Sequence, residues 1–557
     1  MIVSLLINSM HTFAGQSADR SESTETSAPY LRVLEALRKN TAVRPPMPDL
    51  HPVNMVYNRE AIIPPQCYTR TEGKYNPCYV CHQNSRVGRE NVMNDGDLQS
   101  AYSFSDVGMT NHWRNLFEDR SARVAQISDD AIAEWIKQDN YSDLPKRLRA
   151  IDYQGWIPDL DKLQQGAAAF GEYGVAKDGS AWVAFNYKPM PSTFWPTNGS
   201  TDDVMIRLPS AYRANNRGDY SLDVYLANLA ILEANIKELP SIGTPPINEN
   251  AIESDLNGDG KLSVINEISK VDAYVGAARS EFIDTYLYPE GTEFLHTVRY
   301  LGLADDGSIG PSTRMKEVRY MRKWRAYRKP VYARYYQQEG FEKEAGNLPG
   351  YFNVGDHGLD NGMGWSLNGF IEDKNGNLRM NTFEENLFCM GCHNSIGSTI
   401  DKTFSFARKV DGATGWGYIN LKGMPDAPNV GEQQGEILTY LERVGGGGEF
   451  RGNPEMVARW FNPDGAVNRD KIIAAKDVYD LVVPSQSRAL ILNKAYRVIV
   501  EDQDFLYGRD ATVQAPDNVY DFVDNETAPT LSEEHIYDWD IRLNWNQQSS
   551  PERHAAR

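Results

Sequence analysis

The sequence contains the pentapeptide Cys-x-x-Cys-His twice, at residues 78–82 and at residues 389–393. Two thiols three residues apart lie on one face of a helical turn, where they can bond the two vinyl groups of a porphyrin. The histidine that follows is close enough to coordinate the porphyrin iron as its proximal ligand. This spacing is the attachment signature of covalently bound haem c. The two copies therefore predict two haems, held by Cys78, Cys81, His82, Cys389, Cys392 and His393.

Two other chemistries are open to the same four cysteines. Together they could form a four-thiolate zinc site. Either pair could instead be a thioredoxin-like redox couple, which would need a strand before it and a helix after it. Neither alternative explains why a histidine follows each pair. The fifth cysteine, Cys67, is then a buried thiol, an intermolecular partner or an iron ligand.

The local sequence predicts a helical start at both motifs. Thr382 and Glu385 have the spacing of a capping box, which predicts a helix that begins there and continues through the second pair of cysteines. Asn76 and Pro77 are suited to the N-cap and the first helical position ahead of the first pair. Each motif is therefore expected on a helical turn.

On these two pentapeptides and a few surrounding residues, the chain resembles the c-type cytochromes. The resemblance implies maturation outside the bacterial cytoplasm. The order of attachment helix, Gly423-Met424-Pro425 loop and following helix is similar to small single-haem cytochromes, which makes Met424 the candidate sixth ligand of the second iron. His112 is the nearest candidate partner for the first iron, while His296 and His357 flank the second motif at a distance. Each of these side chains could equally be an ordinary packing residue.

A stretch in the middle of the chain matches an EF-hand calcium loop. Asp255, Asn257 and Asp259 occupy its first, third and fifth positions, the obligate glycine follows at position six, and Ser263 is the ninth residue. The backbone of Lys261 would supply a further oxygen. Position twelve departs from the pattern, because the expected glutamate comes one residue late, at Glu267. The loop predicts a weak structural calcium site, and the alternative is an ion-free turn.

Other patterns predict secondary structure without chemistry. Helices are expected from Ser128, over 222–239, over 432–444 and over 493–505, and short strands over 181–187 and 204–208. The basic and aromatic run 314–334 has two interpretations. It is either a solvated helix face with Trp324 packed inward, or a source of arginines for haem propionates.

Composition narrows the class of protein. The 557 residues carry a net charge of −19, which argues against nucleic acid as a partner and favours a basic redox partner protein. No run approaches the ~20 apolar residues of a membrane-spanning helix. Residues 2–16 resemble the end of a secretory signal, so we expect an exported, periplasmic or extracellular bacterial protein.

The resulting prediction is a mainly α, multi-domain protein with small β elements, in which a middle domain separates two helical cytochrome c-like haem domains. The expected parts are a signal remnant 1–20, a leader 21–59, haem domains 60–160 and 351–450, a middle domain 161–350 with the calcium loop, and a C-terminal helical scaffold 451–557. The leading function is electron transfer by an exported di-haem cytochrome. The alternative is a haem enzyme similar to di-haem cytochrome c peroxidases or related oxygenases. A non-catalytic protein that merely contains haem is a third class.

Overall fold

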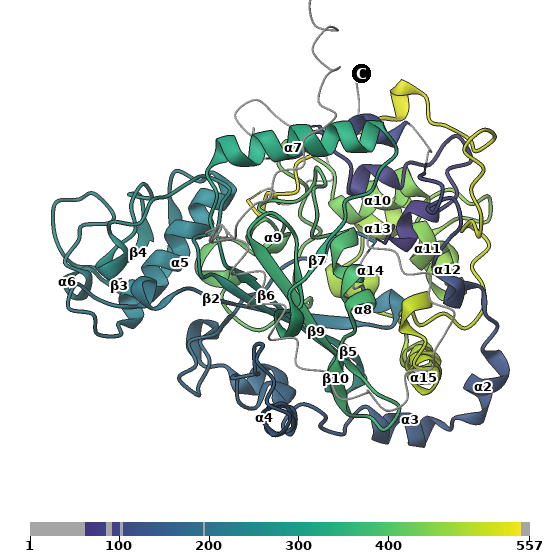
Figure 1. Cartoon of the computed structure of the whole chain (residues 1–557), viewed down its shortest axis with the longest axis horizontal. Helices are drawn as coiled ribbons and strands as arrows, with labels where there is room; N and C mark the ends of the chain where they lie inside the picture. Colours follow the sequence, from purple (N-terminus) through teal and green to yellow (C-terminus); the bar gives the residue numbers. More distant parts are fainter. Residues whose placement is uncertain (1–61, 85–91, 101–103, 193–194, 547–557) are drawn as a thin grey trace, which may run out of the picture. The chain divides into compact units, whose positions relative to one another are not determined.

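An eight-stranded antiparallel sheet forms the centre of the structure (Figure 1). The computed structural model describes residues 62–84, 92–100, 104–192 and 195–546. The strands follow the order β1-β2-β5-β6-β9-β8-β7, and β10 also pairs with β9. The bounds are β1 Val183–Ala184, β2 Thr201–Arg207, β5 Glu293–Leu303, β6 Ile309–Lys323, β7 Phe352–Asn353, β8 Leu359–Asp360, β9 Trp365–Glu372 and β10 Leu378–Met380.

The long hairpin of β5 and β6 organises this sheet. Its tight turn places Gly307 at a φ of +85°, a conformation that glycine adopts without steric cost. Successive side chains of a strand point to opposite faces. Leu295 of β5 and Val318 of β6 therefore pack into a hydrophobic cluster on one face, while their neighbours His296 and Arg319, which pair across the hairpin, face a pocket on the other.

Helices and short loops surround the sheet. The helices are α2 Ser121–Gln126, α3 Asp129–Trp135, α4 Leu144–Ala150, α5 Leu222–Lys237, α6 Glu249–Ile252, α7 Lys329–Glu344, α8 Phe383–Leu387, α9 Ser405–Arg408, α10 Glu436–Val444, α11 Gly447–Arg451, α12 Pro454–Trp460, α13 Arg469–Ile473, α14 Val478–Val482 and α15 Gln486–Asp502. A separate two-stranded sheet, β3 Ile242–Asn248 and β4 Val264–Ile268, packs against α5 (Figure 1).

Several local predictions are confirmed. The Ser128 hydroxyl accepts a hydrogen bond from the Ala131 N–H and caps α3. Thr382 and Glu385 form the predicted capping box at the start of α8. The helix predicted over 222–239 is α5, which ends at Lys237. Most of its residues are buried, so it is not amphipathic as expected, and Leu222 is 40% exposed. These signals are local, so the sequence alone could define them.

The ends of the described chain lie side by side. Thr69 bridges to Val519, and Thr110 bridges to Phe522, across more than four hundred residues of sequence. In Figure 1 the purple segment near the first motif and the yellow C-terminal segment run next to each other. The C-terminal segment therefore supports the first motif directly.

The predicted fold class is wrong. The structure is built on a large antiparallel sheet, and the motifs do not lie in two helical cytochrome c-like domains. The predicted helix over the basic run is also wrong at its start, because Arg314 to Lys323 belong to strand β6 and α7 begins only at Lys329. Trp324 is 42% exposed rather than packed inward. Several charged residues of this run are buried and paired with charges on other elements. Their sequence pattern is the same as that of a solvent-exposed helix face, which is why the prediction failed.

Two predicted segments lie at the N-terminus, where the structure does not describe the chain. The signal remnant 1–20 and the leader 21–59 lie outside the described residues. Within the described ranges, none of the helices combines the length and the apolar composition that crossing a bilayer requires.

Candidate functional site

The two pentapeptides fold into the same turn. Cys78–Val80 and Phe388–Gly391 are both short 3₁₀ helices. In each copy the histidine N–H donates to the carbonyl of the first cysteine at 2.9 Å, as the second cysteine N–H does at 3.2 Å. The second cysteines, Cys81 and Cys392, have φ values of −111° and −114°. Both motifs therefore present two thiols and an imidazole from one backbone geometry.

Both motif histidines are held through the same ring nitrogen. His82 Nδ1 lies 2.9 Å from a carboxylate oxygen of Asp95, and His393 Nδ1 lies 2.7 Å from the carbonyl oxygen of Lys402. An acceptor at Nδ1 fixes the tautomer with the proton on that nitrogen and leaves Nε2 with its lone pair. Each imidazole is thus oriented as a metal ligand is, with Nε2 available for coordination.

Burial and charge set the protonation of this pair of sites. Burial lowers the pKa of His393 to about 4, with the nearby Arg319 and His296 adding to the effect, so its ring is neutral at pH 7. Burial alone would raise the pKa of Asp95, but Lys343 and His82 outweigh it and hold the pKa at about 2. Asp95 is therefore an ionised acceptor for the His82 ring.

The two motifs meet in space although their histidines are 311 residues apart in sequence. The other carboxylate oxygen of Asp95 accepts the N–H of Gln83 and that of Gly397, both at 3.0 Å. The Ser398 N–H donates to the Cys81 carbonyl at 3.0 Å. The segment that follows the second motif is therefore bonded directly to the first.

Both turns open into one large pocket, which we call the central pocket. All five cysteines of the sequence line it, together with His82 and His393. Strands β2, β5, β6 and β9 form one wall, to which they contribute Asp202, Val204, Phe294, His296, Val298, Glu317, Arg319, Met321 and Leu367. The period of two along β5 and β6 brings these side chains to the same face.

This wall is strongly polar. Glu317 accepts hydrogen bonds from Arg319 at 2.9 Å and from Arg509 at 2.7 Å. Asp202 lies 3.2 Å from His296 Nε2 and also accepts a hydrogen bond from the Tyr187 hydroxyl. The central pocket thus has thiols and imidazoles on one side and arginines with paired carboxylates on the other.

Burial sets the protonation state of the cysteine thiols. Cys78, Cys81, Cys389 and Cys392 are free thiols. Burial raises the pKa of Cys78 to about 12 and that of Cys392 to about 11, and it also raises the pKa of Cys389. Within the described ranges, no group of three His, Cys, Asp or Glu side chains is placed to hold a metal ion.

The predicted distal ligands fall in different places. His296 and Cys67 line the central pocket, whereas Met424, His112 and His357 are not among its lining residues. Met424 is a buried core residue next to α14, where its carbonyl accepts the Val478 N–H. His112 stacks near Trp113 and Tyr507, and burial lowers its pKa. The structure therefore brings only His296 and Cys67 of this group to the attachment residues.

The predicted calcium loop uses its oxygens on its own backbone. The Asp255 carboxylate accepts the N–H groups of Gly258 and Gly260 and the ammonium of Lys270, and Asp259 accepts the Lys261 N–H. Glu267 lies in strand β4, while the buried Glu249 accepts the Ser263 N–H. The described residues contain no cluster of three metal-binding groups here. The EF-hand calcium site stays a prediction, on a loop whose carboxylates accept N–H groups of the loop itself.

Comparisons with known proteins show the family. A family model described as “:-like lipoprotein” matches residues 50–479. The chain is also similar to an “Uncharacterized lipoprotein” of Aquifex aeolicus (strain VF5), with 33% identity over 518 residues that cover 82% of this chain and 87% of that protein. No solved structure matches. The chain belongs to this lipoprotein family.

Family membership corrects the predicted resemblance. The chain is not a member of a c-type cytochrome family, and neither its matches nor its sheet-based fold supports that assignment. Lipoproteins are exported proteins, so the family supports the coarser prediction of export. Family membership does not explain the pentapeptides. Their two copies lie far apart in the sequence, yet both line the central pocket.

Reasoning from sequence missed several residues of the site. Arg509 lies 192 residues from its partner Glu317. Asp95 and Lys402 lie only 13 and 9 residues after His82 and His393, but no spacing rule marks them as partners of these histidines. Arg319 was visible only as one of many charges in the basic run. Predicting β5 and β6 as a paired β-hairpin with alternating side chains would have put His296 and Arg319 on one face. In the structure these two residues do pair across the hairpin.

Proposed function

We propose that the central pocket holds two haems, each joined to one pentapeptide through thioethers, and that the protein transfers electrons. A haem bound there supplies an iron that changes oxidation state by one electron. The observation that carries the proposal is the repeated Nδ1 hydrogen bond of His82 and His393, because it orients both imidazoles as proximal ligands from two identical turns.

The chain's own residues fit this group. Cys78, Cys81, Cys389 and Cys392 are free thiols at the pocket wall, as attachment to vinyl groups requires. Arg319 and Arg509 face the same space, and guanidinium groups bind carboxylates such as propionates in a bidentate manner. His296 and Cys67 are candidates for a second axial position. Attachment depends on the pentapeptide and its pocket, so the proposal does not require a cytochrome fold.

Charge and family support a proposed location and partner. We place the protein on the periplasmic or outer side of a bacterial membrane, and membership of a lipoprotein family supports its export. With a net charge of −19, its surface would steer a basic redox protein into contact and repel nucleic acid.

The decisive experiment counts haem. The protein, expressed with a haem c maturation system and exported, should contain two haems per chain by pyridine haemochrome assay and intact mass. Replacing both cysteines of one pentapeptide by alanine should leave one haem, whichever pentapeptide is changed. Cys67→Ala is the matched control and should keep two. Colourless, iron-free protein would overturn the proposal.

One observation favours a second candidate, a haem enzyme that acts on peroxide or oxygen. His296 and Tyr187 share the Asp202 carboxylate inside the central pocket, where they could move protons to a small reactant. Peroxide turnover that His296→Gln abolishes, without loss of haem, would favour the enzyme. Two low-spin irons that are inert to peroxide would favour the carrier.

A further inference from the structure

A second cavity adjoins the central pocket. Pro65, Gln66, Asn198 and Asp510 line both spaces, so the two cavities meet at this set of residues. Three charged side chains, Glu449, Arg451 and Arg488, also line the second cavity. The cavity therefore brings charged groups next to the central pocket from the side of α11 and α15.

A buried lysine lies at the junction of the two cavities. Lys316 is only 1% exposed and lines the central pocket. Its ammonium donates to the Gly199 carbonyl at 2.7 Å and to the Ser200 hydroxyl at 3.1 Å, next to the shared residue Asn198. The rings of Tyr496 and Tyr300 lie beside it, 4.0 and 5.1 Å from the nitrogen.

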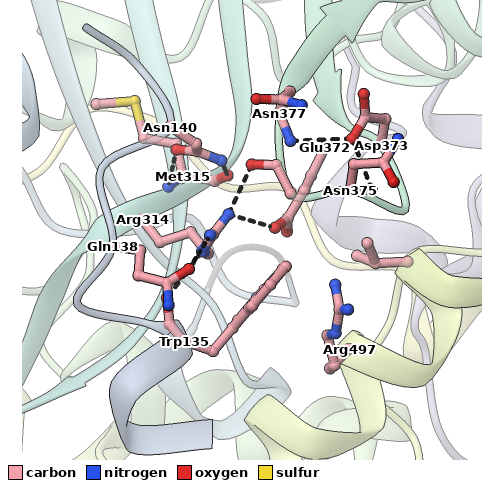
Figure 2. A network of polar contacts seen from close by, with 12 residues as sticks. Trp135, Gln138, Asn140, Arg314, Met315, Glu372, Asp373, Asn375, Asn377 and Arg497 are labelled. Carbon is pink, nitrogen blue, oxygen red and sulfur yellow. Dashed lines mark hydrogen bonds and ion pairs between the residues drawn. The ribbon is translucent and has the colours of Figure 1, made fainter.

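Two of the three carboxylates that act on Lys316, Glu317 and Glu372, are bonded to other groups. Glu317 is bonded to Arg319 and Arg509. Glu372 is bonded to Arg314 at 2.8 Å and to the Tyr300 hydroxyl at 2.6 Å, and Figure 2 shows Arg314 extending between Gln138 and Glu372 above the Trp135 ring. No ion pair within 4.0 Å involves Lys316 among the described residues. A buried ammonium without a paired carboxylate is costly, and its charge responds to the charge of the pocket.

Burial shifts the pKa values of the titratable groups along this route so that the neutral form of each group is favoured. It lowers the pKa of Lys316 to about 7 against the opposing effect of Glu372, Asp510 and Glu317. It raises the pKa of Glu449 to about 7 and raises the pKa of Asp510 as well. Groups whose pKa values lie near the working pH exchange protons readily. The groups that face Lys316 are Tyr300 on β5, Glu317 and Arg319 on β6, Glu372 on β9, Tyr496 on α15, and Arg509 and Asp510 on the C-terminal segment.

We infer that electron uptake in the central pocket is coupled to proton uptake by the Lys316 amine, and that the second cavity is the route by which the proton arrives. The inference rests on the proposed function and couples the uptake of one proton to the proposed electron transfer. One electron enters from an external reductant, and the neutral amine takes one proton from water to become an ammonium. The added positive charge balances the added negative charge inside a poorly solvated space.

The test is a spectroelectrochemical titration of the haem-loaded protein from pH 6 to pH 8. One proton per electron lowers the midpoint potential by up to about 59 mV per pH unit, since each unit is a tenfold change in proton concentration. Lys316→Met should flatten this slope, and so should Lys316→Arg, whose charge is fixed. The matched control is Lys494→Met, because the Lys494 ammonium already pairs with Asp129 at 2.6 Å and lies outside both cavities.

Three further arms separate the possible outcomes. A slope that survives in both Lys316 variants and disappears in Glu372→Gln would overturn the assignment to the lysine. In a potentiometric acid–base titration of the protein, which needs no haem, Lys316→Met should release one proton fewer between pH 6 and pH 8, and an equal count would also overturn it. Asp510→Asn should slow proton uptake at least tenfold in a pH-indicator stopped-flow experiment, and an unchanged rate would overturn the route.

Failure of this inference differs from failure of the proposed function. Protein with two haems and a pH-independent potential contradicts only the coupling. Iron-free protein contradicts the function, and the coupling with it.

Discussion

At the scale of single residues, Asp95 is the acceptor that the site depends on. Its carboxylate holds the His82 ring, the Gln83 and Gly397 N–H groups and the Lys343 ammonium. Removing one partner of a buried charged network costs about 3–5 kcal/mol, because the remaining groups lose their counter-charge. We expect Asp95→Ala to lower the free energy of unfolding by that amount in urea titrations at pH 7. Asp97→Ala, at an exposed neighbouring carboxylate, is the control and should change it by less than about 0.5 kcal/mol.

The same carboxylate predicts a pH dependence. The pKa of Asp95 is about 2 in the folded protein and 3.8 as its ordinary value, so the folded state favours the charged form. Its contribution is therefore fully present above pH 4 and is lost as the pH falls from about 4 to about 2. The stability difference between the parent and Asp95→Asn should shrink over this window by about 2 kcal/mol. A difference that stays constant between pH 5 and pH 2 would contradict the shifted pKa.

At the scale of elements, the link between the motifs depends on a glycine. A Cβ at Gly397 would lie 2.4 Å from the Gln83 carbonyl and 2.5 Å from the Asp95 carboxylate. Neither can move without breaking the contact between the motifs. We expect Gly397→Ala to destabilise the fold by about 1–3 kcal/mol. Under the proposed function it should also lower the amount of haem attached at both pentapeptides. Gly310→Ala is the matched control, since a Cβ there meets nothing within 4 Å, and it should leave both measurements unchanged.

Which elements could be predicted from the sequence depends on the range of the interactions that form them. The cap of α3, the capping box of α8 and the helix α5 follow from residues within a few positions of each other. The strand β6 does not, because its charges are buried through partners on other elements: Arg314 pairs with Glu372 (Figure 2) and Lys323 pairs with Asp401. Tertiary pairing overrode the local pattern, and charge in the sequence did not indicate exposure.

In the candidate site too, features formed by neighbouring residues could be predicted from the sequence, and features formed by distant residues could not. The attachment cysteines and histidines are contiguous in sequence, so the pentapeptides could be identified without a structure. The meeting of the two motifs and the polar wall of β5 and β6 are long-range features. The partners of His82 and His393 follow only 13 and 9 residues later, but no motif marks them. Met424 illustrates the limit of analogy, because a plausible loop order placed it at the iron while the structure places it in the core.

At the scale of the whole molecule, the C-terminal segment completes the first motif. Trp539 is 4% exposed, and its indole N–H donates to the carbonyl of Tyr79, which lies between Cys78 and Cys81. Its backbone N–H donates to the Gln83 side chain at 2.9 Å. Through Asp95 and Gly397 the first motif is in turn bonded to the second. We therefore expect both pentapeptide sites to unfold together when the Trp539 contact with the first motif is removed.

Trp539→Ala tests this expectation. Truncating a buried tryptophan costs about 3–5 kcal/mol, so the urea midpoint should fall in a single transition seen alike by circular dichroism and by tryptophan fluorescence. Hydrogen exchange should accelerate at Tyr79 to Gln83 and also at the second motif, because the two share their hydrogen bonds. Trp324→Ala, at a tryptophan that is 42% exposed, should change stability by no more than about 0.5 kcal/mol. Faster exchange confined to the first motif would show that the two sites unfold independently.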